Sequence, residues 1–320
     1  METYGYLAAV GAAFCWSFTS IFFASAGNRI GSMKVNQIRI VMAVVLLGGM
    51  HFVLKGQIIP LDVTRYEVFY LALSGVIGLF IGDMCYFSSL VIIGPKRASV
   101  MMTISPAASA VAAYILMNEQ LHILSIIGML ITSLGVAVAV SAGKKKALKQ
   151  SALMIAFGVL LGLLGGAGQG VGIAFAKMGL RTVTDTGELV RELDPLSGTL
   201  IRMIAGAACL WIVLLIQELA GYSRKKNSRI AEAVRDKRAM LLIMGGAFVG
   251  PFLGVWASLF AAKHAQTAIA MTIMATFPIL VIPLTMIIYK ERPRLQEIIG
   301  AVISVGGVLI LFLPDILGLG

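Results

Sequence analysis

The chain has 320 residues, of which 59% are hydrophobic and only 13% charged, and its formal net charge is +11. Soluble domains carry about twice this charged fraction, and a soluble core could not bury so much apolar surface, so lipid must be the solvent for most of the chain. Cys15, Cys85 and Cys209 all fall inside apolar runs. They indicate neither a disulfide framework nor a metal site, and we expect no cofactor.

Ten apolar runs follow one another along the chain. About 20 helical residues cover the roughly 30 Å hydrocarbon layer, and a helix satisfies its own backbone groups there. The runs are 4–26, 35–54, 68–91, 95–117, 123–141, 151–176, 197–219, 239–262, 267–289 and 295–313. No Lys or Arg precedes the first run, which is longer than a signal-peptide core, so we interpret it as a span. The sequence therefore predicts an all-α membrane protein with ten transmembrane helices.

Residues 71–140 recur 172 positions later without a gap. Most of the matched positions are apolar in both copies, which a hydrophobic chain gives by chance. Six matched Gly, Pro and Glu positions are harder to dismiss: Gly78/Gly250, Gly82/Gly254, Pro106/Pro278, Glu119/Glu291, Gly128/Gly300 and Gly135/Gly307. We interpret the chain as an internal duplication.

The earlier runs complete the repeat. Phe23-Ala24 matches Phe175-Ala176 at an offset of 152, and Ile38-Arg39 matches Ile201-Arg202 at an offset of 163. The growing offset places two insertions in the second half, in loops 180–196 and 220–238. The halves are then 1–143 and 150–314. Because each has five spans, an odd number, the second enters the membrane from the opposite side, and a binding site is expected near the midplane where the halves meet.

Several of these stretches resemble one known family. The run Gly82-Asp83-x-x-Tyr86-Phe87, the segment 94–99 and the two repeated Pro…Glu…Gly frames are similar to EamA-domain proteins of the drug/metabolite transporter superfamily. The resemblance covers nearly the whole chain as two tandem domains. It implies ten helices around a central cavity and the movement of a small metabolite, often by export of amino acids or related compounds.

Asp83 is the one acid deep inside an apolar run. A carboxylate at that depth is costly and is a functional candidate by default. It could neutralise a substrate amine or carry a coupling proton, whereas the alternative is a structural acid packed on Ser or Tyr86. Its repeat mate is Val255, so the fold does not require an acid there. We expect Asp83 to be unpaired in the empty protein, because Arg97 is about 10 Å away in depth by the helical rise.

Three further polar or aromatic residues, Trp16, Gln169 and Trp256, fall near the middle of their runs. Tryptophan prefers the membrane interface, so these side chains could line a wet cavity and, with Asp83 and Tyr86, bind substrate. Helix packing is the alternative for each.

Two arginines lie about one turn inside their helices, at opposite faces of the membrane. Arg39 shares a face with Glu291, and Arg202 shares the other face with Glu119. Two such pairs would make gates that open in turn. The alternative is that both arginines extend to the lipid headgroups without a partner.

The distribution of charge predicts the orientation. Loops 27–34, 92–97, 142–150, 220–238 and 290–294 hold 18 of the 26 Lys and Arg residues. The positive-inside rule makes these loops cytoplasmic and both termini external, whereas the family resemblance implies the reverse. The basic patches lie in short linkers between spans, so acidic lipid headgroups are a better partner for them than nucleic acid.

These features favour a secondary transporter, an exporter by resemblance, in the cytoplasmic (inner) membrane of the cell. The alternatives are a flippase for a lipid-linked sugar or headgroup and a membrane scaffold. An enzyme is not expected, because the chain lacks a second deep acid for an aspartyl protease and His-Glu-x-x-His spacing for a metalloprotease. The substrate, the coupling to protons and the oligomeric state are left open.

Overall fold

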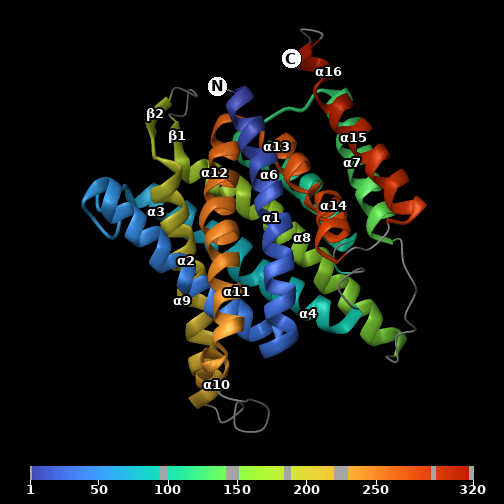
Figure 1. The fold of residues 1–320 in the computed structure, drawn as a ribbon. Coiled ribbons are helices and arrows are strands. Elements are labelled where there is room, and N and C mark those ends of the chain that lie inside the picture. The colour runs from blue at the N-terminus through green and yellow to red at the C-terminus, as the bar shows by residue number, and fades with distance from the viewer. Residues whose placement is uncertain are drawn as a thin grey trace.

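We describe the fold from a computed structural model, which describes residues 2–93, 98, 100–141, 151–183, 189–219, 230–289 and 293–316. Within these residues, eight helical spans are long and apolar enough to cross a membrane, and two shorter ones, Met102–Met117 and Leu295–Leu311, complete a set of ten. The predicted all-α, ten-helix architecture is confirmed (Figure 1). The bounds of the ten predicted runs agree with the helices to within a few residues at most ends.

The first half contains five spans. They are α1 (Glu2–Ile30), α2 (Ser32–Lys55), the continuous α3 (Arg65–Ser74), η1 (Gly75–Gly82) and α4 (Asp83–Ile93), then η2 (Met102–Ile104) with α6 (Ser105–Met117), and α7 (Ile123–Ser141). The second half follows the same order. Its elements are α8 (Ala152–Leu180), α9 (Pro195–Leu219), the short α10 (Ile230–Arg235), α11 (Lys237–Ala247) with η4 (Phe248–Gly254) and α12 (Val255–His264), α13 (Thr267–Met274) with α14 (Phe277–Tyr289), and α15 (Leu295–Leu311) with α16 (Leu313–Ile316).

The two halves deviate from regular helix at matched positions. Each third span contains a π-helical segment, η1 or η4, and these end at Gly82 and Gly254, which are 172 positions apart. The fourth spans are also interrupted alike, by η2 just before Pro106 and by the break between α13 and α14 just before Pro278. Proline lacks the N–H that would continue the helical ladder. Interrupted helices at matched positions of both halves are typical of transporters.

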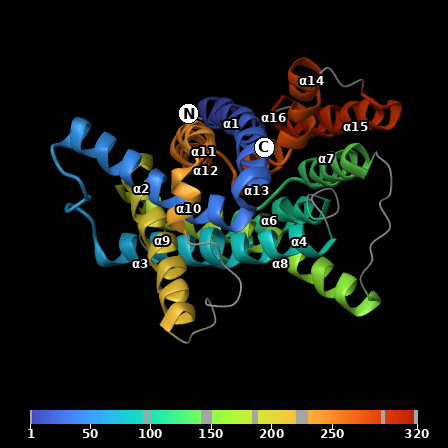
Figure 2. The same ribbon diagram turned by 60° about the horizontal axis from the view of Figure 1, so that its bottom comes forward.

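The contact between α7 and α15 shows how the halves are related. A Cβ at Gly128 would lie 2.7 Å from the carbonyl of Gly307, and one at Gly135 would lie 2.7 Å from the carbonyl of Gly300. Between these contacts, the Ser304 hydroxyl donates to the carbonyl of its own repeat mate, Thr132, at 3.1 Å. The helices are therefore antiparallel, and equivalent residues meet across a local two-fold axis. Figures 1 and 2 show α7 and α15 side by side. For helices that span a membrane, this is the geometry of an inverted repeat.

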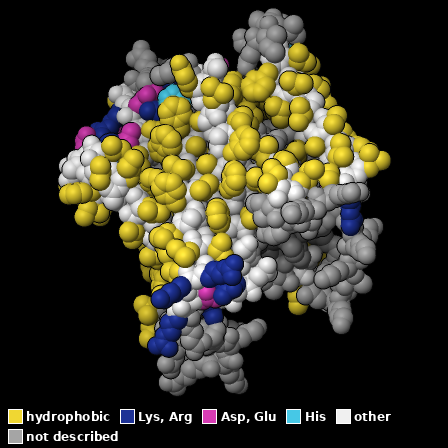
Figure 3. All heavy atoms as spheres, in the orientation of Figure 1, with side chains coloured by type: hydrophobic (Ala, Val, Ile, Leu, Met, Phe, Trp, Pro, Cys, Tyr) yellow, Lys and Arg dark blue, Asp and Glu magenta, His cyan; other side chains and the backbone are white. Residues whose placement is uncertain are grey.

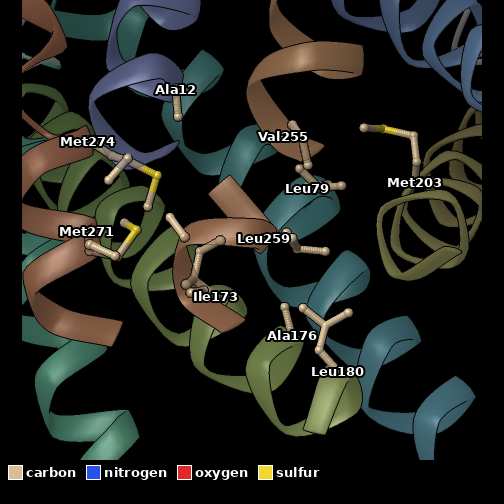
Figure 4. Close-up of a cluster of buried hydrophobic side chains, with 14 of the residues drawn as sticks. Ala12, Leu79, Ile173, Ala176, Leu180, Met203, Val255, Leu259, Met271 and Met274 are labelled. Carbon is tan, nitrogen blue, oxygen red and sulfur yellow. The ribbon is translucent and has the colours of Figure 1, made fainter. Parts of the chain in front are cut away.

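The core lies where the helices of the two halves pack together. Its buried apolar side chains come mainly from α1, α2, α8, α9, α12 and α13, with single residues from α3, η1, η4 and α15, and Figure 4 shows part of this cluster. Val255, the mate of Asp83, is one of them and is 3% exposed. On the face shown in Figure 3, hydrophobic side chains cover the middle of the molecule, and Lys and Arg gather around α10 and α11 at its lower end. This is the surface expected of a protein that spans a bilayer.

The insertion predicted in loop 180–196 contains a small hairpin, which the sequence analysis did not anticipate. Its strands, β1 (Arg181–Val183) and β2 (Leu189–Glu192), pair antiparallel. Arg191 Nε lies 3.0 Å from Oε1 of the buried Glu67, and Lys263 Nζ lies 3.1 Å from Glu192 Oε2. These ion pairs attach the hairpin to both halves of the molecule.

Candidate functional site

Asp83 is the centre of a buried polar cluster. It is the first residue after η1, and it is 7% exposed. One carboxylate oxygen, Oδ2, accepts a hydrogen bond from Arg39 Nη2 at 2.5 Å, and the other, Oδ1, accepts one from Gln169 Nε2 at 2.7 Å. Gln169 also donates to the carbonyl of Gly78 at 3.1 Å. Both oxygens of Asp83 therefore have partners, and those partners come from different halves of the chain.

Arg39 is held on several sides. Its Nε donates to Asn36 Oδ1, one turn earlier on α2, at 2.8 Å. Its guanidinium carbon also lies 5.6 Å from the ring centroid of Phe23 and 5.7 Å from that of Phe87, distances at which the π face attracts a cation. The arginine is thus fixed between two rings with its charge directed at Asp83.

Arg202, the repeat mate of Arg39, approaches the same cluster from the second half. It is 1% exposed, and a Cβ at Gly78 would lie 2.8 Å from its Nη2. The charges of Arg202 and Asp83 are close enough to interact. The cluster therefore combines two symmetry-related arginines with one carboxylate, because Val255 stands at the position that matches Asp83.

One prediction about these residues is wrong, and one alternative does not fit the structure. Asp83 was expected to be unpaired, but it forms an ion pair with Arg39. Both arginines were given headgroup contact as their alternative role, yet Arg39 is 9% exposed and Arg202 only 1%. A charge buried in lipid or protein is costly unless it pairs with an opposite charge. Arg39 on α2 forms such a pair with Asp83 on α4.

The predicted pairing of Arg202 with Glu119 is also wrong. Glu119 Oε1 lies 2.5 Å from Lys177 Nζ, and its Oε2 accepts from the backbone N–H of Thr267 at 3.0 Å. Lys177 donates in addition to the carbonyl of Ala265 at 2.6 Å. Glu119 follows α6 in the first half, whereas the other three residues belong to the second, so this group ties the halves together beside the hairpin. Glu291, the predicted partner of Arg39, lies outside the described residues.

The remaining predicted residues lie in packing contacts with glycines, aromatic rings and the apolar core. Tyr86 is half-buried on α4, with its backbone N 3.0 Å from the Cβ position of Gly165 and its ring 6.0 Å from that of Phe87. Trp16 packs against the apolar core beside Gly254. Trp256 is 39% exposed and lies 6.0 Å from the Phe260 ring. Their substrate-binding role stays a prediction.

Sequence reasoning missed Lys177 and Lys263, both of which are buried and ion-paired. Each lies one residue beyond the end of a predicted run, so each was counted as a loop charge. The signal that could have found them was their position in the last turn of a helix that continues past the apolar run.

Charge pairs also fix the helix ends on the hairpin side. Asp194 caps α9 by accepting from the Ser197 backbone N–H at 3.0 Å, and it forms an ion pair with Lys55 at the end of α2. Partial burial alone would raise the pKa of Asp194, but the hydrogen bonds from Lys55 and Ser197 outweigh it and lower that pKa below its usual value. Asp194 is therefore ionised at neutral pH, and α2 and α9 stay joined there.

The groups of this cluster can bind charge. Within the part of the chain that the structure describes, no group of three His, Cys, Asp or Glu residues could hold a metal ion. Asp83 can accept a proton or a cation if Arg39 moves away, and the guanidinium groups can bind anions.

The fold and this buried cluster define a multi-pass membrane protein built from two inverted halves. The family model of the EamA-like transporter family matches residues 3–141 and 156–313, and the chain belongs to that family. A crystal structure described only as that of a protein superposes with a TM-score of 0.75 at 16% identity, covering 97% of this chain and 96% of the other, which shows a shared fold. No curated protein matches the chain.

Proposed function

We propose that the protein is a secondary transporter that exports a small metabolite, such as an amino acid or a related compound, across the cytoplasmic membrane by alternating access. The observation that supports this most strongly is the Asp83 cluster, whose members come from α2, α4, α8 and α9 of both halves. Ionisable residues at this depth are costly and mark substrate or ion pathways. Inverted repeats place such pathways where the halves meet.

In this proposal Asp83 is the residue that a proton or a substrate amine competes for. Arg39 and Gln169 hold the carboxylate in the state described here, so a proton or cation that reaches Asp83 releases Arg39. Releasing this contact changes how firmly α2 and α8 are held to α4. That change is the step that couples binding to movement of the halves.

We further propose that Glu119 closes the hairpin face together with Lys177, in place of the Arg202 partner predicted from sequence. The contacts of Glu119 with Lys177 and Thr267 join the halves directly. Removing one partner of a buried ion pair strongly destabilises the state that contains the pair. The pair of Glu119 and Lys177 can therefore stabilise a closed gate.

Metabolite profiling of cells with and without the protein tests the function. We expect at least one small metabolite to accumulate outside the producing cells, and its flux into proteoliposomes to require the protein. Unchanged profiles together with no flux would contradict the proposal. Movement of a lipid-linked sugar or headgroup instead would favour a flippase.

A further inference from the structure

Arg202 is a buried cation with incomplete hydrogen bonding. Its residue is 1% exposed, and among the described residues its Nε and Nη1 have no hydrogen-bond partner. Nε carries one N–H and Nη1 carries two, and a guanidinium cannot lose its charge as a lysine can. A buried charge with unmet donors destabilises a fold, so its presence calls for a functional reason.

The repeat mate shows what a satisfied arginine at this position looks like. Arg39 donates from Nε to Asn36 and from Nη2 to Asp83. Both partners belong to the same half of the chain as Arg39, so this arginine needs no group from the second half.

The second half lacks both of these partners. Thr199 stands where Asn36 would be, and its hydroxyl donates to the carbonyl of Pro195. Val255 stands where Asp83 would be and packs in the apolar core. Figure 4 shows Val255 of α12 beside Leu79 of η1. The duplication has therefore kept the arginine and replaced the groups that would neutralise it.

Asp83 interacts with Arg202 through its charge but accepts no hydrogen bond from Arg202 Nε or Nη1, and its oxygens accept from Arg39 and Gln169. The cluster thus contains two guanidinium groups and one carboxylate. Its excess positive charge lies at Arg202, which faces η1 where Gly78 has no side chain.

We propose that Arg202 binds the carboxylate or phosphate group of the transported metabolite. The planar guanidinium matches both groups in geometry and charge. This inference rests on the proposed transport function and adds the group by which the substrate is recognised, an anionic carboxylate or phosphate, together with the residue that binds it.

Thermal unfolding of the purified full-length protein in detergent tests binding. The probes are L-amino acids paired with their C-terminal amides, short mono- and dicarboxylates, and inorganic phosphate. We expect a carboxylate or phosphate probe to raise Tm, the amino-acid amides, which lack the anionic group, to have no effect, and Arg202→Gln to abolish the rise. The inference is overturned if no anionic probe raises Tm, or if the rise persists in Arg202→Gln.

The probe-free protein provides a second test that does not depend on the choice of probe. Methionine is close to arginine in length and is apolar, so Arg202→Met removes an unsatisfied charge and should raise Tm. Arg39→Met is the matched control, and it should lower Tm because it leaves Asp83 without its counter-charge. A Tm lowered by Arg202→Met would show that Arg202 is a structural residue and would contradict the inference.

Proteoliposome flux separates this inference from the transport proposal. If a compound without an anionic group is transported equally by the unaltered protein and by Arg202→Gln, the anion site fails and the transporter stands. If an anionic probe binds through Arg202 but no compound crosses the membrane, the site stands and the transporter fails.

Discussion

At the scale of single residues, the account depends on the ion pair between Asp83 and Arg39. Removing one partner leaves the other charge buried and uncompensated, which costs about 3–5 kcal/mol. We predict this loss in the free energy of unfolding for Asp83→Asn and for Arg39→Gln. The double variant should lose clearly less than the sum, because neither charge is then left alone. Chemical unfolding in detergent measures all four proteins, and additivity within about 0.5 kcal/mol would argue against a direct pair.

The sequence identified Asp83 and Gln169 as candidate site residues, and the structure joins them by a hydrogen bond. Depth within an apolar run is a local property, so it can be read directly from the chain. The partner Arg39 lies 44 positions away on another helix. Which helices are neighbours, and at what depth their side chains meet, is decided by packing, and the pattern of one chain carries no direct signal of it.

At the scale of helices, the pairing of α7 with α15 provides a sharp test of the two-fold contact. A Cβ at Gly307 would lie 2.5 Å from the Thr132 backbone N, whereas at the adjacent Gly306 nothing lies within 4 Å. Overpacking a close helix contact costs about 1–3 kcal/mol. We predict that loss for Gly307→Ala and little change for Gly306→Ala, measured by thermal unfolding. Equal effects of the two substitutions would mean that the helices do not meet at Gly307.

The proposed gate predicts a change in accessibility. Ala265 is 3% exposed, and its carbonyl accepts from Lys177. In a cysteine-free background carrying Ala265→Cys, Glu119→Gln should speed labelling by a membrane-impermeant maleimide at least several-fold, because the closed state loses its ion pair. Each 1.4 kcal/mol lost from the free energy of the closed state raises the ratio of open to closed protein about tenfold. Glu297→Gln, which alters a surface helix cap on α15, is the control, and unchanged labelling in Glu119→Gln would refute the gate.

The repeat offset predicted the division into two halves of five spans, because glycines, prolines and glutamates occur at matched positions in both copies. It did not predict η1 and η4, because glycines four residues apart, such as Gly78/Gly82 and Gly250/Gly254, also fit a regular helix in close contact with a neighbour. Both effects occur: a Cβ at Gly82 would meet α8 at Gly165, and the same residue ends the π-helical segment. One glycine pattern can serve two structural roles, so the pattern could not distinguish them.

At the scale of the whole molecule, orientation is a prediction that charge alone supports. The start of α1 and the short α16 lie at the end of the molecule that carries β1 and β2, opposite α10 (Figure 1), and basic residues gather at the α10 end (Figure 3). The positive-inside rule then places α10 in the cytoplasm and the termini outside. A fluorescent protein that folds only in the cytoplasm, fused after Gly320, should stay dark. A bright fusion would show that the charge argument is wrong.

The central claim is that charge at Asp83 drives transport, and flux into proteoliposomes tests it most directly. The comparison uses the metabolite identified by profiling, with the unaltered protein and the double variant Asp83→Asn/Arg39→Gln, matched for reconstituted amount and for a single peak in size-exclusion chromatography. The double variant leaves no charge uncompensated at the Asp83–Arg39 pair, so a loss of flux reports on function and not on misfolding. We predict that its flux falls to the level of protein-free liposomes at every pH. Flux equal to that of the unaltered protein would contradict the account.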